Sequence, residues 1–95
     1  MKKPEVYILR LKNNQYYIGS TDSLDRRIKE HNDGHVKSTK YKIPAEVIFH
    51  KECNTLTLAR KIEYKIKIQK SKRVVERIIS EKSFDFLFNH GGPLA

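Results

Sequence analysis

Five side chains of this sequence have the chemical types that metal-assisted cleavage of a phosphodiester requires: Tyr7, Tyr17, Arg27, His31 and Glu63. Such cleavage needs a deprotonated water, stabilisation of charge on the phosphate, and help for the leaving oxygen. One carboxylate can hold Mg²⁺, which keeps several waters and takes few protein ligands. A guanidinium can bind a phosphate through two parallel hydrogen bonds, which lysine cannot. A tyrosine, whose pKa is about 10, acts as a base near neutrality only beside positive charge.

The first twenty residues predict a β-hairpin that carries both tyrosines. Residues 5–11 are rich in β-forming side chains and indicate a strand buried on both faces. Residues 12–15 include two asparagines, which tolerate the left-handed conformation of tight hairpins, and residues 16–19 return as an antiparallel strand. We therefore expect Tyr7 and Tyr17 on neighbouring strands, in a register that the sequence alone leaves open.

A helix is expected to position the arginine and the histidine. It begins at one of the capping residues 21–23 and ends near residue 31 or 32, with Gly34 beyond it as a stop signal. Four residues at spacings of three, four and seven share one face of this helix: Leu24, Arg27, Ile28 and His31. Two polar side chains flank an apolar stripe where a purely structural helix favours aliphatic residues.

The rest of the chain predicts a basic loop over 34–44, a strand over 45–52 and two further helices. Asn54 or Thr55 caps the first of these helices, and its expected inner face consists of Leu58, Ala59, Ile62, Ile66 and Gln69. Glu63 borders that face. Ser71 begins the last helix, whose apolar residues are Val74, Val75, Ile78 and Ile79, and phenylalanines follow that can pack back on the sheet. The order β-β-α-β-α-α indicates a small α/β (α+β) domain.

Composition limits the class of protein. The 95 residues fit one compact domain, and 38% hydrophobic with 33% charged residues is typical of a globular chain. No stretch approaches the roughly 20 apolar residues of a membrane helix, and we expect no signal peptide and a cytoplasmic location. The net charge is +9, and residues 60–77, with eight basic and two acidic side chains, supply +6 of it. Such a stripe favours polyanionic partners, although a solvated lysine-rich helix would look the same.

Several segments in order resemble the GIY-YIG endonuclease superfamily, in its small stand-alone bacterial single-domain branch. The resemblance covers about residues 5–80 and is carried by Val6-Tyr7-Ile8, Tyr17-Ile18-Gly19-Ser20-Thr21, residues 26–32, Lys40-Tyr41 with Pro44, and residues 59–67. Val6 stands where glycine gives the motif its letter, while the central tyrosine is retained. An asparagine that the family often carries late in the domain has no convincing match, Asn89 being the only late candidate.

The resemblance implies a small three-stranded antiparallel sheet flanked by helices and a one-metal active site. By position, Glu63 would bind the divalent metal, Mg²⁺ or Mn²⁺, and Arg27 would hold the phosphate. Tyr17 and Tyr7 would position or activate water; the identity of the base stays open, with Tyr17 favoured and Tyr7 in support, and His31 would assist proton transfer. We expect one domain over 1–95, with a core at about 5–80 and a tail at 84–95.

The expected function is therefore a metal-dependent endonuclease that hydrolyses DNA phosphodiester bonds, structure-selective and with little sequence preference. The nucleic-acid backbone would be bound by seven basic residues: Lys37, Lys40, Lys42, Lys61, Lys65, Lys72 and Arg73. The alternative is a non-catalytic DNA- or RNA-binding module of the same fold. Taken singly, Glu63 could be an ion-pair partner of Lys67, and His31 could stabilise a helix terminus.

Overall fold

The computed structural model describes residues 3–88, and within them three strands form one antiparallel sheet with the order β2-β1-β3. The strands are β1 (Glu5–Arg10), β2 (Tyr16–Thr21) and β3 (Glu46–Glu52). The helices are α1 (Leu24–Asn32), α2 (Leu56–Ile68) and α3 (Lys72–Glu81), followed by the short 3₁₀ helix η1 (Asp85–Leu87). The predicted order and the α+β class are confirmed.

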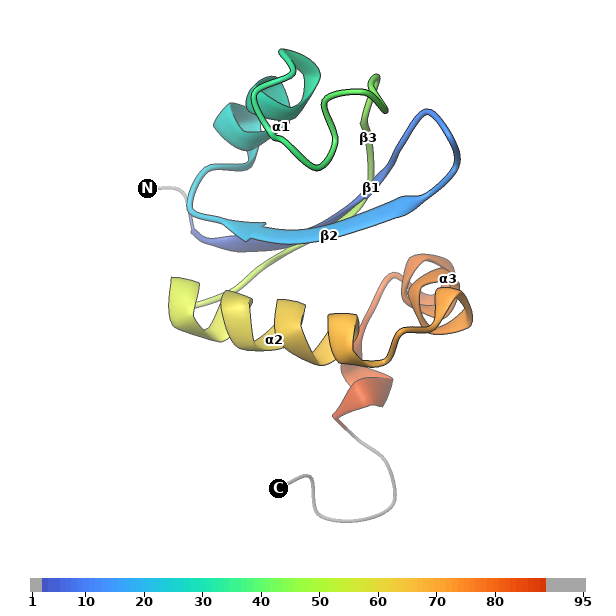
Figure 1. Ribbon diagram of the computed structural model, residues 1–95. Helices are drawn as coiled ribbons and strands as arrows, with labels where there is room; N and C mark the ends of the chain where they lie inside the picture. The colour runs from blue at the N-terminus through green and yellow to red at the C-terminus, as the bar shows by residue number, and fades with distance from the viewer. Residues whose placement is uncertain (1–2, 89–95) are drawn as a thin grey trace.

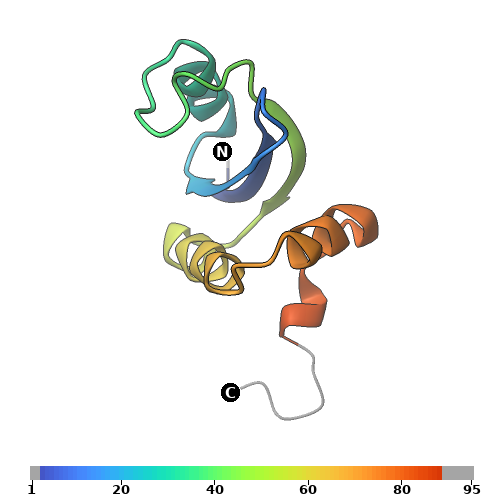
Figure 2. The same ribbon diagram turned by 45° about the vertical axis from the view of Figure 1, so that its right-hand side comes forward.

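The sheet separates two layers. Helix α1 and the segment 33–45 cover one face, and α2 and α3 cover the other (Figures 1 and 2). The central strand β1 contributes to both: Val6 and Ile8 join the cluster around α2 and α3, while Tyr7 and Leu9 belong to the cluster beneath α1. All four are at most 1% exposed, which confirms a strand buried on both faces. Strand β2, by contrast, lies at an edge of the sheet.

The hairpin register aligns the two tyrosines diagonally. Asn14 adopts φ 64°, the left-handed conformation expected of the turn. Tyr7 then lies opposite Gly19, and Leu9 lies opposite Tyr17. Because opposed residues of an antiparallel pair point to the same face, both tyrosines project toward α1.

The loop between α1 and β3 is anchored at both ends and in its middle. Asn32 bonds both backbone groups of Ala45, accepting from its N–H at 2.8 Å and donating to its carbonyl at 3.2 Å. Gly34, at φ +80°, reverses the chain after the helix. Val36 and Thr39 are buried, so the expected basic loop presents its lysines outward from a fixed backbone.

The helices over the other face begin where the caps predict. Thr55 Oγ1 accepts from the Leu58 N–H, and Ser71 Oγ accepts from the Val74 N–H. The inner face of α2 is Ala59, Ile62 and Ile66, whereas Leu58 is 41% exposed and Gln69 is exposed at the C-cap. The placement of Leu58 and Gln69 on that face was wrong. Leu58 lies about 100° around the helix from Ala59, and Gln69 follows the last helical turn.

The aromatic residues after α3 return to the sheet as predicted. Phe84 packs edge-on against Phe49 of β3 with ring centroids 6.0 Å apart, and Leu87 is buried beside it. Arg77 covers the Phe86 ring at 3.9 Å. In the part of the chain between residues 3 and 88, no helix has the length and apolar character that crossing a bilayer requires.

Candidate active site

Tyr7 is hydrogen-bonded to a buried histidine. Its hydroxyl lies 3.2 Å from His31 Nε2, and His31 Nδ1 lies 2.9 Å from Thr39 Oγ1. Thr39 Oγ1 is also 3.4 Å from the Val36 carbonyl. One assignment of protons satisfies the whole chain: Tyr7 donates to Nε2, Nδ1–H donates to Thr39, and Thr39 donates to Val36. His31 then holds the acceptor that Tyr7 needs.

Burial sets the protonation state of both partners. His31 is fully buried, and this desolvation, with the nearby Arg27 charge, lowers its pKa from 6.5 to about 4. The imidazole is therefore neutral near pH 7, as its acceptor role requires. Desolvation also raises the pKa of Tyr7 to about 12, against the opposing effect of Arg27. Tyr7 therefore keeps its hydroxyl proton near pH 7.

Arg27 connects the two tyrosines to α1. Its Nη1 donates to Glu30 Oε1 at 3.0 Å, which fixes the side chain along the helix. Hydrogen bonding to the hydroxyls of Tyr7 and Tyr17, together with Glu30, raises the pKa of the guanidinium, so Arg27 is always charged. Because its side chain is still 34% exposed, the remaining N–H groups can reach a ligand.

Tyr17 stacks within the same cluster. Its ring lies edge-on to His31 with centroids 4.8 Å apart, and 6.3 Å from the Tyr7 ring. Gly19 leaves the space that the Tyr7 ring occupies, because a Cβ there would lie 2.5 Å from Tyr7 Cζ. Tyr17 is only half-buried, so this phenol faces the outside of the cluster.

Glu63 lies across the edge strand from this cluster. It borders the apolar face of α2, as predicted, with its side chain 20% exposed. Ser20 Oγ donates to Oε1 at 2.5 Å, and Lys67 Nζ bonds Oε2 at 2.5 Å, which confirms the expected ion pair with Lys67. Lys67 Nζ also lies 5.9 Å from the centroid of the Tyr17 ring. The carboxylate is thus held on the α2 side of β2.

The edge strand β2 lies between the tyrosine cluster and Glu63 and contributes a residue to each side. Tyr17 projects toward α1 and Ser20 toward α2, because neighbouring side chains of a strand alternate between faces. Among residues 3–88 no further strand lies outside β2, so its outer edge is unpaired. Glu63 is near enough that its charge contributes to the raised pKa of Tyr7. Four predicted residues, Tyr7, Tyr17, Arg27 and His31, therefore lie in one cluster on the α1 side of the sheet, and Glu63 lies on the α2 side of β2.

A single divalent cation fits the donor set around Glu63. No group of three or more His, Cys, Asp or Glu side chains with ligand geometry exists among residues 3–88. Mg²⁺ is commonly held by one carboxylate and substrate phosphate, with water filling the remaining positions. Each Glu63 oxygen accepts one hydrogen bond and keeps further lone-pair capacity. The residues present therefore suit a one-carboxylate site.

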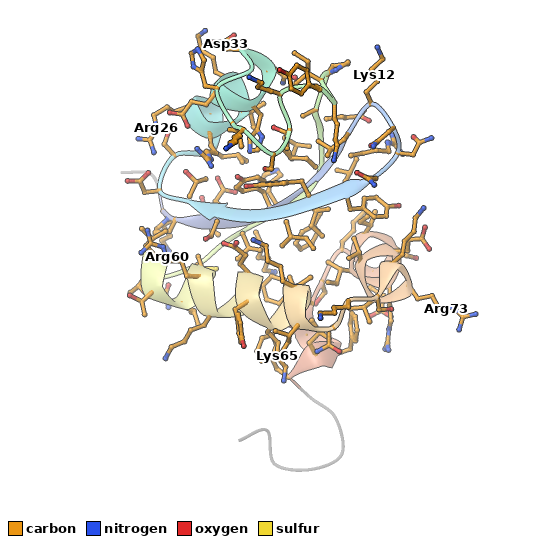
Figure 3. The ribbon with its side chains drawn as sticks, viewed as in Figure 1. Lys12, Arg26, Asp33, Arg60, Lys65 and Arg73 are labelled. Carbon is orange, nitrogen blue, oxygen red and sulfur yellow. The ribbon has the colours of Figure 1, made fainter. Side chains whose placement is uncertain are left out.

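The seven basic residues predicted to bind the nucleic-acid backbone do not form one surface. Lys65 lies on the side of α2 away from the sheet, and Arg73 points outward from α3 (Figure 3). Lys72 lies over the Tyr16 ring at 5.7 Å, beside a groove of about 600 Å³ that reaches Tyr17. The remaining four are divided between the loop over α1 and the exposed side of α2: Lys37, Lys40, Lys42 and Lys61.

Sequence reasoning included Ser20 and Arg60 only as members of motif segments, and it missed Thr39. Thr39 fixes the His31 ring, Ser20 fixes Glu63, and Arg60 lies with Arg26 beside Arg27. Short hydroxyl residues in loops and strand ends carry no periodic signal, so only the folded contacts identify them. Asn89 lies outside the described residues.

Comparison with known proteins gives matches over most of the chain. A family model described as the GIY-YIG catalytic domain matches residues 3–78. The UPF0213 protein YazA of Bacillus subtilis is 38% identical over 77 residues, which are 80% of this chain and 77% of YazA. The UPF0213 protein YhbQ of Escherichia coli is 31% identical over 77 residues, covering 80% and 76% of the two chains. The names of these relatives state no reaction or substrate.

A solved structure shares the fold. The solution NMR structure of the UPF0213 protein BH0048 from Bacillus halodurans matches with a TM-score of 0.56 at 32% identity. The match covers 88% of this chain and 89% of that protein, so it includes the sheet and its flanking helices.

Proposed function

Because this chain belongs to the GIY-YIG family, whose catalytic domain acts on nucleic acid, we propose that it is a metal-dependent endonuclease that hydrolyses DNA phosphodiester bonds. The observation that carries the proposal is the arrangement around β2. The Tyr17 phenol and the Arg27 guanidinium lie with the neutral His31 on the α1 side of β2, and the Glu63 carboxylate lies on its α2 side, bonded to Ser20. A nuclease role would use both the buried Tyr7–His31–Thr39 chain and the Glu63 carboxylate, which taken singly could serve packing and an ion pair with Lys67.

Arg27 is the residue that would bind the scissile phosphate. It is permanently charged, anchored by Glu30, and keeps exposed N–H groups beside both tyrosine hydroxyls. Two parallel hydrogen bonds to phosphate oxygens would both orient the group and stabilise the charge that develops on it. A divalent cation, Mg²⁺ or Mn²⁺, would be held by Glu63 and would supply stabilisation to the phosphate and the leaving oxygen.

The two tyrosines would have different tasks. We assign the base role to Tyr17, which is half-exposed and receives positive charge from Arg27 on one side and Lys67 on the other. Tyr7, with its raised pKa and its bond to His31, stays protonated and positions Arg27 and Tyr17. His31 holds Tyr7 in this role, because its unprotonated Nε2 accepts the hydrogen bond of the Tyr7 hydroxyl.

The proposal is tested by cleavage of a labelled DNA panel of duplex, nicked, flap, branched and single-stranded substrates. Each is incubated with Mg²⁺, Mn²⁺ or chelator, using wild type, Glu63→Gln and Glu81→Gln. Glu81 is the matched control, because it forms an ion pair with Arg77 at the same helical spacing that joins Glu63 and Lys67. We expect metal-dependent products whose rate falls by at least about 100-fold in Glu63→Gln and is unchanged in Glu81→Gln.

Two outcomes contradict the proposal. Full cleavage by Glu63→Gln would remove the carboxylate from the mechanism. Binding without product on every substrate, with either metal, would identify a DNA- or RNA-binding module instead, and competition between the two polymers would show which one it prefers.

A further inference from the structure

A pocket with three arginines lies beside the active site, at the end of β2. Its volume is about 360 Å³, and its lining comes from the end of β2 (Thr21, Asp22), from α1 (Arg26, Arg27) and from α2 (Leu56, Arg60). We call it the arginine pocket. Figure 3 shows Arg26 and Arg60 at the same end of the sheet, the first beside α1 and the second beside α2.

The pocket is electropositive from several directions. Three guanidinium groups face one acidic lining residue, Asp22, which Arg26 pairs at 2.6 Å. Outside the lining, Glu30 pairs with Arg27 at 3.0 Å and with Arg26 at 3.9 Å, which leaves Arg60 as the arginine of the pocket with no ion pair among residues 3–88. Helices α1 and α2 both begin at this end of the sheet (Figure 1), so both helix dipoles add positive potential there. Arg60 reaches across from α2 far enough that its charge helps to lower the pKa of Asp22.

The arginines, and not the hydroxyl groups, have capacity for a ligand. Thr21 Oγ1 is bonded to both backbone groups of Ser23, at 3.1 and 3.2 Å. Ser20, which borders the pocket, donates to Glu63. Arg60 is exposed and donates no hydrogen bond to any residue between 3 and 88. Five guanidinium N–H donors per arginine in a fixed fork suit the oxygens of a phosphate.

Arg27 belongs both to this pocket and to the tyrosine cluster. We propose that the arginine pocket binds a second phosphate of the substrate strand, next to the one that Arg27 holds for cleavage. This inference rests on the proposed function for the identity of the strand. The pocket would fix the strand direction across the edge of β2, because it exists at one end of that strand only.

Asp22 gives the proposal a variant whose expected effect is opposite to that of the arginine variants. Its carboxylate occupies part of the guanidinium capacity of Arg26 and opposes a phosphate. Removing its charge in Asp22→Asn should strengthen binding of the second phosphate. Removing Arg26 should weaken binding by more than one lost charge would, since Asp22 is then left unpaired in the pocket.

The test uses thymidine dinucleotides that carry the internal phosphate alone, or one further phosphate at the 5′ end or at the 3′ end. Binding is followed through backbone amide NMR shifts, with chelator present so that no turnover occurs. We expect the extra phosphate at one end to strengthen binding by about tenfold in wild type. Arg26→Gln and Arg60→Gln should lose that gain, and Asp22→Asn should enlarge it.

Two lysines serve as charge-matched controls outside the pocket. Lys29→Gln removes a charge from α1 that is paired to Asp33 at 2.6 Å, as Arg26 is paired to Asp22. Lys12→Gln removes an exposed charge at the opposite end of the sheet (Figure 3). Both should keep the tenfold gain. Equal losses in the lysine and arginine variants, or no gain from a second phosphate at either end, would overturn the proposal. Because the titration needs no turnover, its result is independent of whether Glu63→Gln abolishes cleavage.

Discussion

Gly19 lies opposite Tyr7 in the β1–β2 pair, and the absence of its side chain creates the space that the Tyr7 ring fills. A Cβ at this position would come within 2.5 Å of Tyr7 Cζ, a separation that backbone and ring cannot both keep. Tyr7 is 1% exposed and bonded to His31, so it has no free direction in which to move. Gly19, the last residue of the triplet Tyr17-Ile18-Gly19, is therefore required for the packing of Tyr7, the central residue of the first triplet.

Gly19→Ala should displace the Tyr7 ring and with it the bond to His31. We expect a loss of about 1–3 kcal/mol in the free energy of unfolding from overpacking, measured by urea denaturation. Cleavage by the folded variant should fall by about 100-fold, because a displacement near 1 Å at a reacting group has that effect. Gly34→Ala is the control, since Gly34 has φ +80° and a Cβ there would meet Lys40 Cβ at 3.9 Å, an ordinary contact. It should lose about 1–2 kcal/mol through backbone strain and keep its turnover.

The neutral state of His31 predicts how stability depends on pH. Its pKa is about 4 in the folded protein and about 6.5 in the unfolded chain, so acid favours the unfolded chain, which takes up the proton first. The neutral His31 therefore contributes fully to the free energy of unfolding above pH 6.5. This contribution, which is at most about 3 kcal/mol, is lost as the pH falls toward 4. Urea midpoints across this range should decline more steeply in wild type than in His31→Gln. His35→Gln, at an exposed loop position, should follow wild type; parallel curves for all three proteins would refute a neutral His31.

Arg27→Lys keeps the charge and removes the planar fork of donors. We expect cleavage to fall by about 100-fold, because the two parallel bonds to phosphate and the contacts to both tyrosine hydroxyls are lost together. DNA affinity, which depends on net charge, should change by less than about threefold. Arg10→Lys, whose side chain pairs with Glu46 at 2.7 Å on an exposed surface, should leave both quantities unchanged. A parallel fall in affinity and turnover would mean that Arg27 only attracts the polymer.

Two aliphatic residues of α2, one buried and one exposed, test which face of this helix packs against the sheet. Ile66→Ala should lower the free energy of unfolding by about 2–4 kcal/mol, because Ile66 is 1% exposed within the main cluster. Leu58→Ala should lower it by less than about 1 kcal/mol, since that side chain is 41% exposed. Thermal or urea unfolding of both variants checks the corrected inner face of α2. Comparable losses would restore the face that the sequence pattern predicted.

Local patterns predicted the elements well, because each depends on residues close together in the chain. Thr55 and Ser71 cap their helices as their chemistry requires, and Asn14 takes the turn conformation that asparagine tolerates. Periodicity failed at Leu58, where an apolar residue next to the buried stripe extends a pattern without extending the core. Propensity alone cannot distinguish such a neighbour from a core position.

The motif spacing predicted five candidate residues, whose catalytic roles stay predictions, but it did not predict their partners. Thr39 and Ser20 contact the candidate residues across 8 and 43 positions in the sequence, and no local pattern indicates these pairings. The raised pKa of Tyr7 follows from burial by two layers, which a strand pattern indicates only qualitatively. The arginine pocket likewise exists only where β2, α1 and α2 end or begin together.

The long-range bonds within the site have a consequence for newly made or damaged protein. Tyr7 and His31 are 24 positions apart, and Ser20 and Glu63 are 43 apart, so in an unfolded chain these groups rarely meet. Each bond closes only when a strand has paired and a helix has docked on it. The proposed cleavage activity therefore requires the folded domain. Local unfolding of either helical layer should abolish cleavage, because it separates one of these bonded pairs.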